Sequence, residues 1–207
     1  QTGLFKMARH TLFYVVGAVT LAMLVGFALA WVVERTDLPI PGFFFVAILV
    51  PFLLPQGTLA YAWLVHVLPR TGTVNTWLRS ALGVNGDTGP LDPFNIHTMV
   101  LFQGLLLTPI IFLVLAATLR NQNGAMEEAS RTSGAGHWAT GRRITAPLLF
   151  PGAFTAVVLG VWLTLDSTLV PNLLGGVSKA SLFNYRMWAA LNSLDGGFLG
   201  YGLASAY

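Results

Sequence analysis

The ionisable residues of this 207-residue chain are few, and their spacing matches no familiar catalytic or metal-binding arrangement. There is no Cys, which excludes disulfides and thiolate metal sites. The phosphate-binding pattern Gly-x-x-x-x-Gly-Lys-Ser/Thr is absent, and so is the Gly-x-Ser-x-Gly elbow of hydrolases. The four His are scattered without the spacing of metal ligands, at positions His10, His66, His97 and His137. The sequence therefore predicts neither an enzyme site, nor an ATPase site, nor a metal site in this chain.

Three polar side chains stand out because they lie within or beside long apolar runs. Asp166 ends such a run, and acidic groups near membrane depth are costly and often functional. It is open to two interpretations: a group that lines or gates a pathway, or a helix-end group at the water interface. Gln56 and Gln103 are likewise candidates for a pathway or for hydrogen bonds between neighbouring helices.

The amino-acid composition indicates whether the segments that contain these residues lie in water or in lipid. Hydrophobic residues make up 55% of the chain and charged residues only 9%, whereas roughly a quarter of a soluble domain is charged. So few charges cannot cover a water-facing surface, but lipid tolerates them. The formal net charge is +3, but the basic residues form no dense cluster, so the sequence does not indicate nucleic-acid binding.

The apolar runs predict an all-α fold, a polytopic transmembrane helical bundle. The second run holds Pro51 and Pro55, so we expect one kinked span there, and Pro109 lies inside the third. Short helices are expected at 74–82 and 182–194, and a loop at 171–179. The expected spans are residues 11–33, 43–68, 96–119 and 147–166, and another starts at about residue 198.

A motif with fixed spacing lies between the third and fourth expected spans. The stretch Glu128-Ala129-Ser130-Arg131-Thr132-Ser133-Gly134 is followed, after nine residues, by Ile144-Thr145-Ala146-Pro147. It resembles the EAA loop of type I ATP-binding cassette importer permeases, which reads Glu-Ala-Ala, three residues, Gly, nine residues and Ile-x-Leu-Pro. Ser130 and Ala146 depart from that pattern by small changes. We expect helices at 126–133 and 137–144, with Gly134 as a left-handed helix end.

The resemblance implies a fold, a function and a set of partners. Residues 1–207 would form one permease transmembrane domain of a type I importer, with 120–146 as its cytoplasmic coupling loop. The implied partners are a dimer of cassette ATPase subunits, a second permease half or subunit, an extracytoplasmic solute-binding protein and the lipid membrane, with no nucleic acid. ATP and Mg would be held by the ATPase, and no cofactor by this chain. The residues implied to couple to the ATPase are Glu128, Ala129, Ser130, Gly134, Ile144 and Pro147.

Further stretches resemble the ferric-iron subgroup of these permeases. They are residues 30–39, which contain Arg-Thr-Asp-Leu-Pro, residues 165–175, which contain Pro-Asn-Leu-Leu-Gly, and residues 200–206. This resemblance implies ferric iron as the solute, although related permeases carry thiamine, polyamines or phosphonates. It also implies that the chain is a fragment, one half of a fused permease, located in a bacterial inner membrane.

Two questions stay open on the sequence alone. The distribution of Lys and Arg between the loops is nearly neutral, so it does not fix the orientation in the membrane. An ion-coupled secondary transporter or channel is the alternative function, since the prolines suit broken helices, but the expected spans lack buried charges. An integral membrane enzyme would need a catalytic set that the sequence does not offer.

Overall fold

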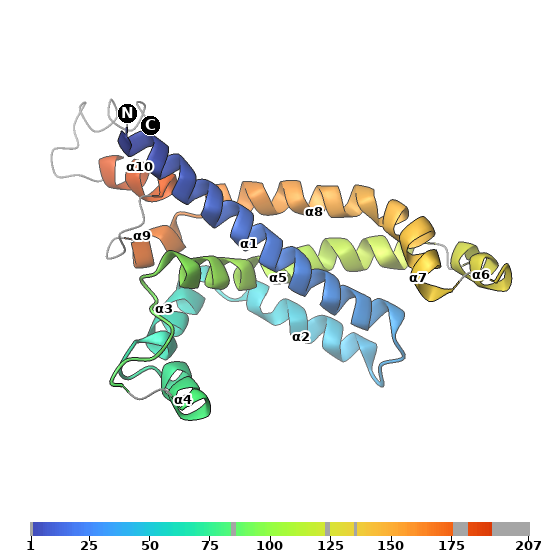
Figure 1. Cartoon of the computed structure of the whole chain (residues 1–207), viewed down its shortest axis with the longest axis horizontal. Coiled ribbons are helices and arrows are strands. Elements are labelled where there is room, and N and C mark those ends of the chain that lie inside the picture. Colours follow the sequence, from blue (N-terminus) through green and yellow to red (C-terminus); the bar gives the residue numbers. More distant parts are fainter. Residues whose placement is uncertain (1, 84–85, 123–124, 135, 176–181, 192–207) are drawn as a thin grey trace.

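A computed structural model describes residues 2–83, 86–122, 125–134, 136–175 and 182–191, and every regular element in these ranges is a helix (Figure 1). The elements are α1 (Thr2–Arg35), α2 (Pro41–Leu53), α3 (Gln56–Val67), α4 (Thr73–Leu82), α5 (Ile96–Asn121), α6 (Ala125–Thr132), α7 (His137–Thr140), a π-helical turn η1 (Gly141–Thr145), α8 (Ala146–Asp166), α9 (Leu169–Gly175) and α10 (Phe183–Leu191). The fold is the all-α, transmembrane helical bundle that the sequence predicts.

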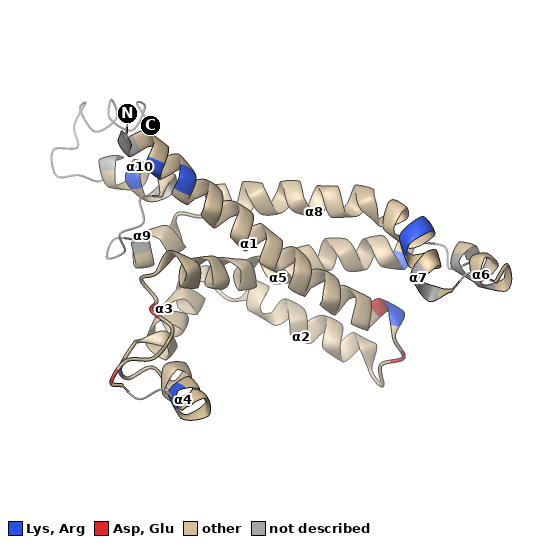
Figure 2. Ribbon diagram, viewed as in Figure 1, with Lys and Arg blue, Asp and Glu red and all other residues tan. Residues whose placement is uncertain are grey.

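Three of the described helices are long and apolar enough to cross a membrane: α1, α5, and α8 together with η1. The 26 residues of α5 extend about 39 Å at 1.5 Å per residue, more than the roughly 30 Å of a bilayer core. Charged residues lie towards the two ends of these helices and leave the middle of the bundle free of charge (Figure 2). This distribution is what a lipid-embedded bundle requires.

The closest helix pair is α1 with α5, and small residues allow its close approach. A Cβ added to Gly104 of α5 would lie 3.0 Å from the backbone oxygen of Ala18 on α1 and 2.7 Å from a methyl carbon of Leu21. One added to Gly26 of α1 would lie 3.0 Å from a methyl carbon of Ile111. Lipid tails are as apolar as Leu, so such close packing, rather than the hydrophobic effect, holds membrane helices together.

The second apolar run bends sharply at its prolines. We expected one kinked span over residues 43–68, and in the structure α2 and α3 together are apolar and long enough for a span but meet at 93°. Pro51 lies in the last turns of α2, and Pro55 directly precedes α3. Leu54 between them is extended, with φ −84° and ψ 144°, because the ring of a following proline disfavours the helical conformation. The two prolines together end one helix before the next begins.

The expected loop at 171–179 is wrong over its first half, since α9 is helical through Gly175. Pro171 is the third residue of α9, and a proline fits the first turn because no backbone N–H is needed there. Helix α10 occupies most of the expected short helix at 182–194, while residues 192–194 and the expected span at about residue 198 lie outside the described residues.

We predict that Gly104→Ala lowers the stability of the bundle by about 1–3 kcal/mol, because its methyl group would press on the α1 backbone and α1 would have to move. The measurement is the thermal unfolding midpoint of the purified protein in detergent. Gly42→Ala is the matched control, since its methyl group would meet nothing within 4 Å. Equal midpoints for wild type and Gly104→Ala would show that the α1–α5 contact is not tight.

Candidate coupling site

The segment that carries the motif lies at one end of the bundle. Helices α6 and α7 are at the same end as the last turn of α1 and the start of α2, while α3, α4 and α9 lie towards the other end (Figure 1). Arg35, which ends α1, is therefore on the same side as the motif. Within the described chain, α1 and α5 both run towards the motif end and α8 runs back from it, which agrees with this placement.

Helix α6 ends in a left-handed glycine. The Ser133 backbone N–H and hydroxyl both donate hydrogen bonds to the Ala129 carbonyl, over 3.1 and 2.7 Å. Gly134 then has a φ of 85°, a conformation that only glycine adopts readily. The structure therefore agrees with the helix end predicted at Gly134. Ala129, Ser133 and Gly134 are all exposed, and Glu128 lies on α6 between Ala125 and Thr132.

A hydrogen bond joins α6 to α7. The Ser130 and Thr140 hydroxyl oxygens are 2.9 Å apart, and the Thr140 side chain is buried. The sequence analysis missed this contact, because it considered Ser130 only as a substitute for Ala in the motif. A pair of hydroxyl groups ten positions apart is no signal until the turn between the two helices is known. The contact fixes the angle at which α6 leaves the bundle.

The base of the site is continuous with a membrane helix. Helix α7 passes into η1, and η1 passes into α8 without a break in helical structure, so the helix expected at 137–144 is the start of the span. Ile144 is half-buried in η1, and Pro147 is exposed as the second residue of α8, where its missing N–H leaves a carbonyl of the preceding turn without a helical partner. A π-helical turn inside a helix often marks a functional position.

A charged cluster joins the neighbouring helix ends on this side. Arg120, near the end of α5, binds the Glu34 carboxylate of α1 through two nitrogens at 2.7 and 3.2 Å. Its guanidinium also lies 5.3 Å from the centre of the Phe45 ring on α2. Arg35 donates to the Leu119 carbonyl and the Gln122 side-chain oxygen at 3.4 Å. Sequence reasoning missed the pair, although opposite charges at the same-side ends of two spans were the signal.

The three pathway candidates lie near the opposite end. Gln103 is buried, and its side-chain oxygen accepts a hydrogen bond from the Tyr14 hydroxyl of α1 at 3.0 Å. The Ser167 hydroxyl, next to Asp166, is 3.5 Å from that same oxygen. Asp166 and Gln56 are both exposed, as the last residue of α8 and the first of α3. Gln103 thus has the helix-to-helix bond that was one of its two interpretations.

The described residues contain no group of three His, Asp or Glu side chains close enough together to hold a metal ion. The motif region instead has what a docking site needs: an exposed short helix, a glycine turn and a rigid base in the membrane.

The family profile described as the binding-protein-dependent transport system inner membrane component matches residues 13–206. The chain belongs to this family. Its members are membrane components of transport systems, so the chain is a permease component rather than an enzyme. The match extends over the helices and the motif region together, which agrees with the importer permease that the motif predicts.

The individual relatives are 26 to 27% identical to this chain. The molybdenum transport system permease protein ModB of Haemophilus influenzae is 26% identical over 161 residues, which are 75% of this chain and 67% of that protein. The inner membrane ABC transporter permease protein YdcU of Escherichia coli is 27% identical over 185 residues, 83% of this chain and 58% of that protein. ModB of Escherichia coli is 27% identical over 142 residues, 69% of this chain and 59% of that protein. The chain thus spans 58 to 67% of the length of these relatives.

We predict that Gly134→Ala loosens the end of α6, because a side chain in the left-handed region is disfavoured by about 1–2 kcal/mol. Backbone amides of α6, including that of Ser133, should then exchange with deuterium several-fold faster. Gly136→Ala is the matched control two residues away, since its φ is not left-handed and its methyl group would meet nothing within 4 Å. Unchanged exchange in Gly134→Ala would contradict the assigned helix end.

Proposed function

We propose that this chain is the membrane-spanning permease subunit of an ATP-driven importer, and that residues 125–145 dock onto the ATPase subunit. The observation that carries the proposal is the continuity of the motif with the membrane domain: α7, η1 and α8 form one unbroken helical stretch. A force applied to α7 is therefore carried directly into α8, and α6 is linked to α7 by the hydrogen bond between Ser130 and Thr140.

The docking surface we propose is the exposed side of α6 and the turn after it. Ala129, Thr132, Ser133 and Gly134 are exposed, and all of them are small, so a partner backbone can approach closely. Glu128 is proposed as the polar anchor for that partner, with Ile144 and Pro147 holding the base of the loop. The bond between the Ser130 and Thr140 hydroxyls keeps α6 at a fixed angle to α7.

Transport in this proposal is a switch between two arrangements of rigid helices. ATP and Mg bind to the partner ATPase, whose closure moves α6 and α7 together with α8, and a second permease half moves likewise. An extracytoplasmic binding protein delivers the solute at the opposite end of the bundle, and the chain itself binds no cofactor. Such a change needs differential contacts with the partner in the two states, and the docking surface supplies them. The setting we propose is a bacterial inner membrane, crossed several times.

For the solute we propose a small inorganic ion. Two of the relatives above are named for molybdenum transport, which favours an oxyanion such as molybdate. The resemblance of residues 30–39, 165–175 and 200–206 to ferric-iron permeases favours ferric iron instead. Uptake of radiolabelled molybdate and iron by the complete transporter separates the two candidates. Of the pathway candidates, Asp166 and Gln56 are exposed near the entry side, whereas Gln103 is engaged with Tyr14.

A secondary transporter or channel is the second candidate, and the observation that favours it is the proline-broken pair α2 and α3. Broken helices form the ion sites of many such transporters. The two candidates differ in their energy source. Uptake into proteoliposomes that requires internal ATP supports the importer, while uptake driven by an ion gradient without ATP supports the secondary transporter.

We predict that the full-length protein, solubilised in detergent, captures its ATPase subunit in a pull-down, and that Glu128→Ala and Gly134→Trp lose most of it. The first change removes the proposed anchor, and the second fills the turn with a bulky side chain and strains it. Asp87→Ala and Gly86→Trp are the matched controls, because they make the same kinds of change in an exposed loop at the other end. The proposal fails if the two loop variants retain the ATPase as well as these controls do.

A further inference from the structure

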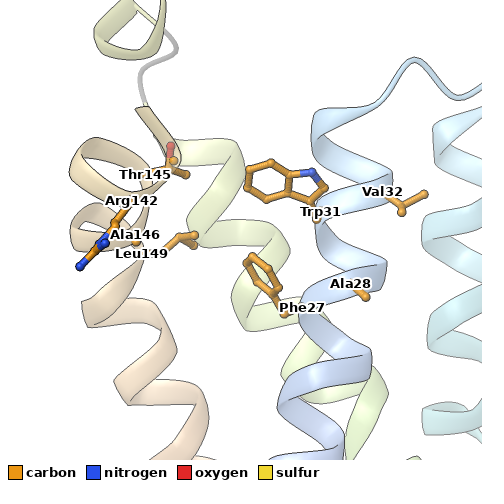
Figure 3. Close-up of a pocket in the computed structure, with 9 residues that line it drawn as sticks. Phe27, Ala28, Trp31, Val32, Arg142, Thr145, Ala146 and Leu149 are labelled. Carbon is orange, nitrogen blue, oxygen red and sulfur yellow. The ribbon is translucent and has the colours of Figure 1, made fainter. Parts of the chain in front are cut away.

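A groove separates the last turns of α1 from the start of α8. It encloses about 720 Å³, and its walls are almost entirely apolar. Trp31 and Phe27 extend from α1 towards Leu149 and Thr145 on the facing side (Figure 3). The two aromatic side chains remain 38% and 39% exposed, so the groove is open to whatever surrounds the bundle. A lipid acyl chain can therefore lie against these side chains.

The groove lies where both helices pass from apolar to charged sequence. Trp31 precedes the charged Glu34 by less than one turn on α1. On the facing side, Arg142 and Arg143 precede the apolar stretch that starts at Ala146. Trp residues concentrate at the level of the lipid headgroups. The groove therefore starts at the headgroup level and continues into the apolar layer.

The mouth of the groove is basic. Arg142 belongs to its lining, Arg143 follows it, and both side chains are exposed. Among the described residues, no ion pair is formed by either of them, and Glu34 at the end of α1 is bound to Arg120 instead. The Arg142 side chain extends along the start of α8 on the side away from Trp31 (Figure 3). Since it is exposed, rotation about its own bonds can turn the guanidinium towards the mouth.

We propose that this groove binds an anionic phospholipid, with one acyl chain along the apolar walls and the phosphate held by Arg142 and Arg143. The Trp31 ring lies within the groove at headgroup level and forms part of the wall against which the upper part of the lipid would pack. Basic pockets between membrane helices recognise anionic headgroups in this way. The inference goes beyond the proposed transport function and does not depend on it.

Charge decides between a lipid and a protein occupant. A helix from a second copy would have to bring a carboxylate to the level of Arg142; Glu34 at the end of α1 is already paired, and Asp37 lies beyond the end of that helix. An anionic phospholipid brings both a phosphate at that level and a chain that fills the groove. The arrangement also places a lipid beside η1, where the motif region enters the membrane.

The test is native mass spectrometry of the full-length, delipidated protein titrated with phosphatidylglycerol or with phosphatidylethanolamine. We expect phosphatidylglycerol to bind more tightly, and the double variant Arg142→Gln/Arg143→Gln to weaken it about tenfold or more. Lys6→Gln/Arg9→Gln is the matched control, since it removes two exposed charges at the opposite end of α1 and should bind like wild type. Equal binding of the two lipids by wild type, or unchanged binding by the Arg double variant, overturns the proposal.

A second pair of variants tests the groove itself. Ala146→Phe places a ring in the groove and should weaken the binding of either lipid, whereas Ala47→Phe, on the exposed side of α2, should not. The natural sequence has no Cys, so Ala146→Cys gives a clean cross-linking probe. If oxidised membranes yield a disulfide-linked pair of Ala146→Cys chains, the groove is an interface between two copies and the lipid proposal is wrong.

Discussion

The close contact between α1 and α5 is the constraint on which the rest of the structure depends. Gly104 lies directly against the backbone of Ala18, and any side chain there would force the two helices apart. In lipid the hydrophobic effect does not push helices together, so this fit must supply the association. Helices α2, α8 and α9 all pack against α5, and their positions follow from it.

That central pair also determines how the motif region is held. The end of α1 is joined to the end of α5 by the Glu34–Arg120 pair, and because the Arg120 side chain is exposed, water weakens this interaction. The pair positions the end of α1 next to the end of α5, and Phe45 of α2 lies beside the same Arg120 guanidinium. Helix α8 packs against both α1 and α5, and its extension through η1 and α7 carries the motif.

The sequence predicted those structural features that depend only on residues close together in the chain. Charge-free runs predicted α1, α5 and α8, because the backbone of a lipid-embedded segment must bond within itself. Gly134 predicted the left-handed turn, because glycine adopts that backbone conformation readily and other residues do not. The prolines predicted a bend in the second run but not its 93° angle, and the helix through Pro171 was not predicted. The Ser130–Thr140 bond and the groove beside Trp31 were not predicted because each depends on where a distant element lies. For Glu128 and its neighbours the sequence supplied the motif, and their coupling function remains a proposal.

The most direct test of the central claim is site-specific photo-cross-linking in native membranes. A photoreactive amino acid at exposed Met126 or Thr132 of α6 is compared with one at exposed Trp77 of α4, at the opposite end. The account predicts cross-links from α6 to a cassette ATPase subunit, strengthened or weakened by ATP, and none to that subunit from Trp77. Cross-links to the ATPase from Trp77, or none from either α6 position, would contradict it.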